Sequence, residues 1–390
     1  MKKALKQIVI WLIFITLTTG CLNQSPSDYL QMILSKTESN AQKERSFPNE
    51  IDVEAEHDFP FSIHAKLIAS DREKIKIAEI EKCVLSKEII LRLMDYFSCN
   101  NDWKDEDGNN FVLANPSFEA FQDIDGEKAV FRVTRDNMFE YIKNYQVVVM
   151  RDEYLYDSPE RANDFLEEPA ISYEKALEIA ERVLADLSFY IDDSITLCYG
   201  SKAVGYIGDS PTAYGWEFVF TRSCGGLQTP YRSEYDLWAN SDPPVACAPW
   251  EKECLFIFVD ETGLYRVDAR GLGKEKRIWE TNSHLLPYEE ILQCIINQLK
   301  KQHPGPIKGD KTSDWELEIK KITLCSVLLN DQNDSVGYMV PAWEVEYSLG
   351  YSIGNVNELF TQYTYFNAID GTYIEPRITM NDAEEAYGVK

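Results

Sequence analysis

The sequence predicts an α+β fold of tandem repeats, in which one helix packs on an antiparallel sheet, preceded by a smaller α+β N-terminal region. Three observations support this prediction. Two amphipathic helical patterns are each followed by an Ile-Thr-Leu-Cys motif, at residues 195–198 and 322–325. A tryptophan, Trp216 or Trp343, lies 21 residues after the isoleucine of each motif. Self-similarity of this kind indicates an internal repeat.

The two predicted helices share a polar start and a single apolar face. The first opens with Ser172-Tyr173-Glu174 and the second with Pro287-Tyr288-Glu289. Proline in a first helical turn costs no hydrogen bond, and early glutamates suit the helix dipole. The apolar positions recur at helical spacing. They are Ala176, Leu177, Ala180, Val183, Leu184 and Leu187 in the first helix, and Ile291, Leu292, Ile295, Ile296 and Leu299 in the second.

Each copy ends in an aromatic strand, a turn and a further strand. Asp260 and Gly263 in the first copy, and Asp370 and Gly371 in the second, are expected to form these turns. Aspartate bonds its own backbone there, and glycine supplies a positive φ. Each copy is therefore expected to bury its helix against an antiparallel sheet.

The region before the repeats has shorter patterns. It contains strand candidates at 61–69, 74–80 and 129–133 and a helical pattern that follows Ser86, a suitable N-cap. The whole chain then divides into a signal peptide (1–20), a flexible polar tether (21–50), an N-terminal α+β domain (51–168), a first repeat (169–284) with an insert at 223–253, and a second repeat (285–390).

The first residues predict export. Lysines at positions 2, 3 and 6 precede an apolar run from Ile8 to Leu17. A helix of about ten residues spans roughly 15 Å, about half of a bilayer core, so this run suits a signal peptide better than a membrane span. The run ends at Leu17-Thr18-Thr19-Gly20-Cys21, which resembles the lipobox of bacterial lipoproteins.

The lipobox resemblance implies that Cys21 carries a lipid. Its sulfur would take a diacylglyceryl group, and two or more acyl chains, palmitate for instance, anchor a protein stably. Thr18 departs from the usual bulkier aliphatic residue at its position, so an ordinary secretory signal with an incidental cysteine is the alternative. The expected location is the extracytoplasmic face of the cell membrane, with Cys21 as the lipidation site.

The net charge of the chain argues against binding to nucleic acid and to anionic lipid head groups. It carries 65 acidic residues against 39 Lys and Arg, a formal net charge of −26. A surface this acidic repels nucleic acid and anionic lipid head groups. The acidic residues are spread along the chain, so most of them are expected to lie on a solvated exterior.

Eight of the nine cysteines follow Cys21. An even number outside the cell permits disulfides, but no C-x-x-C motif is present. The wide spacings favour buried thiols, and pairing of Cys224 with Cys247 or Cys254 is the alternative.

The repeat motifs carry a resemblance to a known family. The Ser-Tyr-Glu helix opening, followed by strands and an Asp-containing turn before glycine, resembles the PepSY-like module of extracytoplasmic bacterial proteins. The layout also resembles uncharacterised Gram-positive lipoproteins whose last strand carries Asn-Ala-Ile-Asp-Gly, here residues 367–371. The resemblance covers roughly residues 170–376. It implies inhibition of peptidases or regulation of envelope signalling proteins, with no catalytic residues.

The residues themselves predict no catalytic, cofactor or metal site. The four histidines form no H-E-x-x-H, and no G-x-S-x-G, P-loop or G-x-G-x-x-G occurs. Asp102–Gly108 resembles a calcium loop but lacks the ligand spacing. Adjacent carboxylates such as Glu167-Glu168 or Asp192-Asp193 are expected by chance and do not predict a glycosidase. Trp216 and Trp343 are expected in the core rather than as ligand stackers.

The insert 223–253 is the one irregular stretch long enough to suggest function. Its Tyr231, Tyr235, Trp238 and Trp250 suit protein recognition, or equally cover a sheet edge. The leading hypothesis is a non-catalytic, membrane-anchored protein that binds or regulates an envelope protein, such as a protease or a sensor. A solute- or glycan-binding lipoprotein is the first alternative, and a hydrolase with an unrecognised site is the second.

Overall fold

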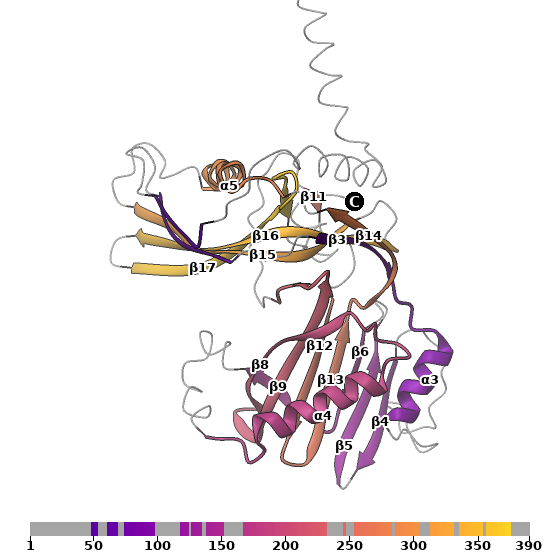
Figure 1. Ribbon diagram of the computed structural model, residues 1–390. Coiled ribbons are helices and arrows are strands. Elements are labelled where there is room, and N and C mark those ends of the chain that lie inside the picture. Colours follow the sequence, from indigo (N-terminus) through magenta and orange to yellow (C-terminus); the bar gives the residue numbers. More distant parts are fainter. Residues whose placement is uncertain are drawn as a thin grey trace, which may run out of the picture.

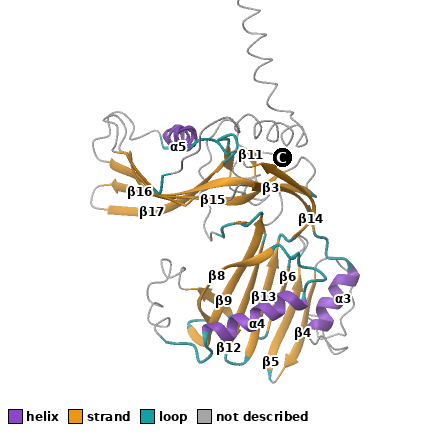
Figure 2. Cartoon of the chain, in the orientation of Figure 1, coloured by secondary structure: helices purple, strands orange, loops and turns teal. Residues whose placement is uncertain are grey.

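The computed structural model of this chain is mostly β, with two large curled sheets that each form a half-barrel. Each sheet has nine strands, and three helices accompany them in the described part of the chain (Figures 1 and 2). The structure describes residues 48–53, 61–68, 74–97, 118–124, 126–134, 138–151, 167–231, 245–246, 253–282, 285–303, 313–330, 335–353 and 356–375.

The first sheet, called the α4 sheet, lies behind helix α4 (Tyr173–Asp186) in Figure 1. All of its strand pairs are antiparallel, and helix α3 (Lys87–Tyr96) also packs against it. In spatial order its strands are β4 (Phe118–Ile124), β5 (Glu127–Val133), β6 (Phe139–Ile142), β13 (Gly263–Arg270), β12 (Cys254–Asp260), β9 (Ser210–Cys224), β8 (Ile195–Ile207) and β7 (Val148–Arg151), with β10 (Leu227–Gln228) on β9.

Helix α4 forms where the apolar periodicity predicts it. The Ser172 hydroxyl caps the helix by accepting from the backbone N–H of Lys175 at 3.3 Å. Its small residues Ala176 and Ala180 are fully buried, so the helix lies close to strands β9, β12 and β13. Ser86 caps α3 in the same way, through the N–H of Ile89 at 3.3 Å. Both caps satisfy backbone donors that a helix start leaves without a partner.

The second sheet, called the α5 sheet, carries helix α5 (Tyr288–Gln302) on one face. It is antiparallel except at the pairs β2–β15 and β11–β18, which are parallel. Its main order is β1 (Glu50–Val53), β2 (Phe61–Ile68), β15 (Ser313–Asn330), β16 (Val336–Ile353), β17 (Val356–Asn367), β18 (Tyr373–Glu375) and β11 (Val245–Ala246), with β3 (Lys74–Lys82) paired to both β16 and β14 (Gly273–Asn282).

The predicted α+β fold of PepSY-like helix-on-sheet repeats is wrong. Strands from the region before the repeats complete both sheets: β1, β2 and β3 join the α5 sheet, and β4 to β7 join the α4 sheet. Neither copy therefore closes a sheet of its own, and the expected smaller N-terminal α+β unit does not form. The predicted helices and strands are present in the described residues, although strands such as β1, β4, β6, β7 and β14 were not predicted. Periodicity carries no information on which distant strands pair.

The equal spacing of 21 residues does not place the two tryptophans in equivalent positions. Trp216 lies opposite Lys202 in the β8–β9 pair, whereas Trp343 lies opposite Leu324 in the β15–β16 pair. The two hairpins therefore turn at different distances from the shared Ile-Thr-Leu-Cys motif. Trp343 is buried in the core beneath α5. Trp216 is partly exposed, and its indole N–H donates to the carbonyl oxygen of Ile171 at 3.0 Å.

The two predicted turns are confirmed. The Asp260 carboxylate accepts from the N–H of Thr262 at 2.8 Å, and Gly263 follows with a φ of 109°. Asp370 accepts from the N–H of Thr372 at 2.9 Å around Gly371, whose φ is 73°. An L residue with a side chain rarely adopts such a φ, which is why glycine occupies both positions.

Several predicted features lie outside the described residues. These are the lipobox with Cys21, the tether up to residue 47, the acidic loop Asp102–Gly108 and most of the insert 223–253. In the portion that is described, no helix is long and apolar enough to cross a membrane. Cys224 is a thiol that donates to the carbonyl oxygen of Lys76 at 3.6 Å, so the alternative of a Cys224 disulfide is not realised.

A buried ion pair joins the two sheets where the chain crosses between them. The guanidinium of Arg222, at the end of β9, donates two hydrogen bonds of 2.6 Å to the Glu253 carboxylate. It also donates to the carbonyl oxygen of Gly273 at 2.7 Å, and Glu253 accepts from the N–H of Gly273 at 2.8 Å. Gly273 begins β14, a strand of the other sheet. Arg222 is 1% exposed and Glu253 is 5% exposed, so the pair is shielded from solvent.

Asp192 adds a second link between the sheets. Its carboxylate accepts from the N–H of Glu275 in β14 at 3.0 Å and lies 3.5 Å from the guanidinium of Arg222. Burial alone would raise the pKa of Asp192, but the hydrogen bonds from Ser194 and from the Glu275 backbone, together with the charge of Arg222, hold that pKa below its usual value.

Replacing Arg222 by methionine is expected to lower the free energy of unfolding by about 3–5 kcal/mol, because Glu253 would remain buried without its partner. The double variant Arg222→Met/Glu253→Leu should lose less than the sum of the two single variants. Urea denaturation followed by circular dichroism measures both. The control is Arg182→Met, which removes an exposed ion pair with Glu178 and should cost less than about 0.5 kcal/mol. A similar loss of unfolding free energy in Arg222→Met and Arg182→Met would contradict the stabilising role of the Arg222–Glu253 pair.

Asp192 is expected to make stability depend on pH in the acid range. Because its folded pKa is lowered, its contribution is fully present above its unfolded pKa of about 4 and is lost as the pH falls through the folded value. Asp192→Asn should therefore be less stable than the wild type at pH 7, with a difference that narrows below about pH 4. Asp193→Asn, at the exposed neighbouring position, is the control. A stability difference between Asp192→Asn and the wild type that does not change with pH would contradict the contribution of the Asp192 charge.

Candidate functional site

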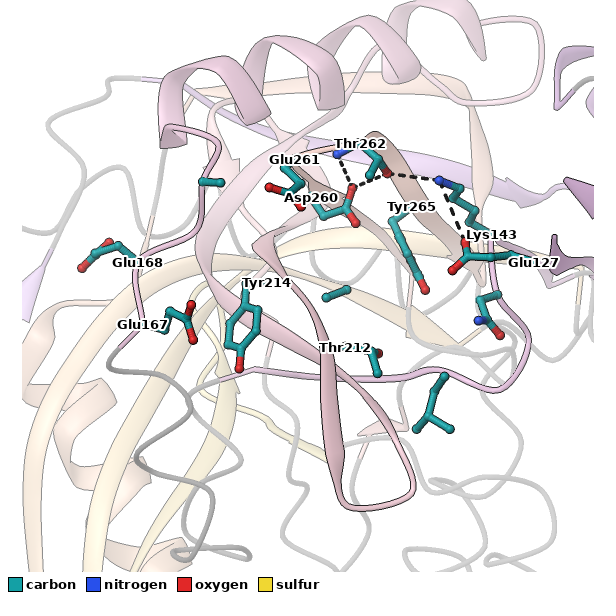
Figure 3. A pocket seen from close by; sticks show the side chains of 14 residues that line it. Glu127, Lys143, Glu167, Glu168, Thr212, Tyr214, Asp260, Glu261, Thr262 and Tyr265 are labelled. Carbon is teal, nitrogen blue, oxygen red and sulfur yellow. Dashed lines mark hydrogen bonds and ion pairs between the residues drawn. The ribbon is translucent and has the colours of Figure 1, made fainter. Parts of the chain in front are cut away.

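An acid-lined pocket of about 540 Å³ lies at one end of the α4 sheet (Figure 3). Five separate segments meet there: the β12–β13 turn at 260–262, the start of β5, the connection after β6 at 143–144, the segment before α4 at 167–170 and the β8–β9 hairpin at 207–214. The pocket exists because strands far apart in sequence end at the same edge of one sheet.

The β12–β13 turn provides the rigid part of the pocket. Asp260 is 5% exposed, and its carboxylate accepts from both the N–H of Thr262 and the Thr262 hydroxyl, the latter at 2.6 Å. The Lys143 ammonium then donates to the Thr262 oxygen at 3.3 Å and lies 3.9 Å from the Glu127 carboxylate. This chain of contacts, drawn as dashed lines in Figure 3, holds Lys143 against the wall of the pocket.

Tyr265 contributes a largely buried side chain to the same pocket. It is the unpaired residue of β13 at the bulge in the β12–β13 pair, and its ring packs edge-on against Phe258 with centroids 5.6 Å apart. The residue is 4% exposed and lines the pocket, yet its hydroxyl makes no hydrogen bond within the described part of the chain. Burial, and then the charges of Glu127 and Asp260, raise the pKa of Tyr265, so the hydroxyl keeps its proton at neutral pH.

The pocket carries a strong excess of negative charge. Five carboxylates line it, and Lys143 is the one cationic lining residue. Glu168 is paired with Lys202, outside the lining, whereas Glu167 and Glu261 are exposed and have no ion-pair partner among the described residues. Like charges at this density repel one another, and a bound cation would relieve that repulsion.

The side chains of the lining supply carboxylates, one ammonium and several hydroxyls. Thr262 is the hydroxyl nearest to a carboxylate, but its proton is held by Asp260 inside a turn. No histidine or cysteine lines the pocket. Across the described residues, no group of three His, Cys, Asp or Glu side chains is placed to hold a metal ion.

The structure separates the residues that the sequence singled out. Glu167 and Glu168 line the pocket, whereas Asp192 belongs to the sheet junction. Tyr231, in the insert, packs edge-on against Phe256 at 5.1 Å rather than standing free on a loop. Cys21 lies outside the described residues.

Sequence reasoning missed the main pocket residues. Asp260 was predicted only as a turn former, and Tyr265, Glu127 and Lys143 were not considered. A tyrosine close behind an Asp-containing turn was the one local signal available. Glu127 and Lys143 reach the turn only because β5 and β6 join the same sheet as β13, which no local pattern shows.

Comparison with known proteins gives the fold alone. No protein-family model and no curated protein matches the chain. Among solved structures, the crystal structure of an uncharacterized protein from Eubacterium rectale is similar, with 15% sequence identity and a TM-score of 0.50. The match covers 90% of this chain and 99% of that chain, so the shared fold spans both sheets.

Removal of the Tyr265 hydroxyl should leave stability nearly unchanged. Because this hydroxyl has no partner within the described chain, Tyr265→Phe is expected to alter the free energy of unfolding by less than about 0.5 kcal/mol. Asp260→Ala, which breaks the turn contacts to Thr262, should cost about 1–3 kcal/mol by the same urea denaturation. A loss above about 1 kcal/mol in Tyr265→Phe would mean that the hydroxyl serves the fold.

Proposed function

We propose that this protein is a lipid-anchored binding protein of the extracytoplasmic membrane surface, which holds a positively charged partner without chemically altering it. The observation that carries the proposal is the acid-lined pocket, where five carboxylates surround one lysine. Complementary charge guides encounter and sets specificity more than it sets affinity. A basic segment of an envelope protein, such as a protease or a sensor, is the partner that this surface fits.

Location at the membrane rests on the N-terminal sequence. The basic start, the apolar run and the lipobox-like residues up to Cys21 support export followed by lipid attachment. A lipid at Cys21, followed by a polar segment, would hold the two sheets near the membrane and raise the effective concentration of any membrane-bound partner.

A small solute is the second candidate ligand. The pocket volume of about 540 Å³ lies within the range typical of small-molecule sites, and Tyr214 and Tyr265 line it. A solute-binding role would use the same carboxylates and the Tyr265 hydroxyl. It predicts that the ligand is a free small molecule and not a segment of a protein.

The membrane anchor is tested by labelling cells with an alkyne analogue of palmitate during expression in a Gram-positive host. The wild type should take up the label and fractionate with membranes, whereas Cys21→Ser should take up none and leave the membrane fraction. Cys198→Ser, which changes a cysteine of strand β8, should stay labelled. Equal labelling of Cys21→Ser and the wild type would contradict anchoring.

Partner binding is tested by cross-linking in intact cells and purification from solubilised membranes. The variant Glu167→Lys/Glu261→Lys should lose the proteins that the wild type captures, because it reverses two exposed pocket charges. Asp95→Lys/Glu181→Lys makes the same change in net charge on exposed positions of α3 and α4 and should retain them. Identical capture by both charge-reversed variants would contradict binding at the pocket.

A further inference from the structure

We infer that the acid-lined pocket binds an alkylammonium group, with the Tyr265 hydroxyl as its hydrogen-bond partner and an aliphatic stem against the apolar part of the lining. This inference rests on the proposed function and names the chemistry of the ligand. The ammonium could belong to a free diamine or to a lysine side chain of a protein partner, and the two sources share the same recognition.

The hydroxyl of Tyr265 is the first argument. The hydroxyl of a tyrosine whose side chain is largely buried usually finds a hydrogen-bond partner. Tyr265 is 4% exposed, Figure 3 shows it projecting into the pocket, and no hydrogen bond of the described chain uses its hydroxyl. A protonated phenol still has lone pairs to accept a bond from an N–H donor, so a ligand that brings such a donor completes the site.

The charge of the lining is the second argument. Glu167 and Glu261 face solvent at the pocket without ion-pair partners among the described residues, and Lys143 is already held by Thr262 and Glu127. An anion would meet net repulsion from the five carboxylates, which outnumber the single ammonium of the lining. A cation gains from the whole set of carboxylates, and charge-assisted hydrogen bonds are stronger than neutral ones.

The composition of the lining favours an alkylammonium over a metal ion. No three potential metal ligands come together within the described residues, which disfavours a bare divalent ion. Ala170, Ile207 and Ala213 line the pocket beside the carboxylates. A ligand with methylene groups behind its charge covers these side chains, as lysine stems do when they lie along apolar surfaces. An alkylammonium has both parts.

Isothermal titration calorimetry of the full chain in detergent tests the inference with two probes. These are 1,5-diaminopentane and the peptide acetyl-Gly-Lys-Gly-amide. At least one should bind with 1:1 stoichiometry and weaken as salt is raised, because screening reduces the attraction. The uncharged counterparts, 1-pentanol and the same peptide with an acetylated lysine, should not bind. Binding of the diamine alone indicates a free solute, and binding of the peptide alone indicates a protein segment.

Variants assign the binding to this pocket. Glu167→Gln/Glu261→Gln should lower the affinity for the probe by at least about tenfold and Tyr265→Phe by about fivefold. These losses are those expected when charge-assisted hydrogen bonds are removed. Glu181→Gln on the exposed face of α4 should leave it unchanged. Absence of binding by both probes, or binding that ignores the pocket variants, overturns the inference. If the wild type still captures membrane proteins when neither probe binds, the proposed function stands and only the alkylammonium inference is wrong. If it captures none, both the inference and the proposed function are wrong.

Discussion

The ion pair between Arg222 and Glu253 is the interaction on which the two-sheet arrangement depends. It lies where the chain passes from β13 into β14, and it ties the end of β9 to the first residue of a strand in the other sheet. A charge that is almost fully buried is costly to leave without a partner, so this contact tolerates few alternative geometries. Asp192 is bonded across the same junction, and the Cys224 thiol of β9 donates to the carbonyl oxygen of Lys76 in β3.

The α4 sheet combines a closed face with an open end. Helix α4 covers one face through small residues such as Ala176 and Ala180, which bring it close to strands β9, β12 and β13. At the edge where β5, β9, β12 and β13 start or turn, the polar side chains of the connecting segments gather around the pocket. Regular packing thus fixes the positions of the strands, and the segments that connect their ends form the pocket. The likeness to the Eubacterium rectale structure extends over both sheets but carries no information about this pocket.

The polar groups of the candidate site fall into two sets. Asp260, Thr262 and Lys143 are bonded to one another and shape the wall, whereas the Tyr265 hydroxyl and the exposed carboxylates are directed at the space itself. Such a division suits recognition, because the fixed groups hold the geometry and the others remain available for a ligand.

The sequence by itself determined the local elements: the caps at Ser86 and Ser172, the apolar faces of the helices and the turns at Asp260 and Asp370. These depend on contacts between residues a few positions apart, which periodicity and residue type encode. Only the tertiary structure decided that strands before residue 168 complete both sheets, and that Glu127, Lys143 and Tyr265 meet at one pocket. Strand pairing depends on contacts between distant segments, and equal spacing along the chain, as for Trp216 and Trp343, does not fix it.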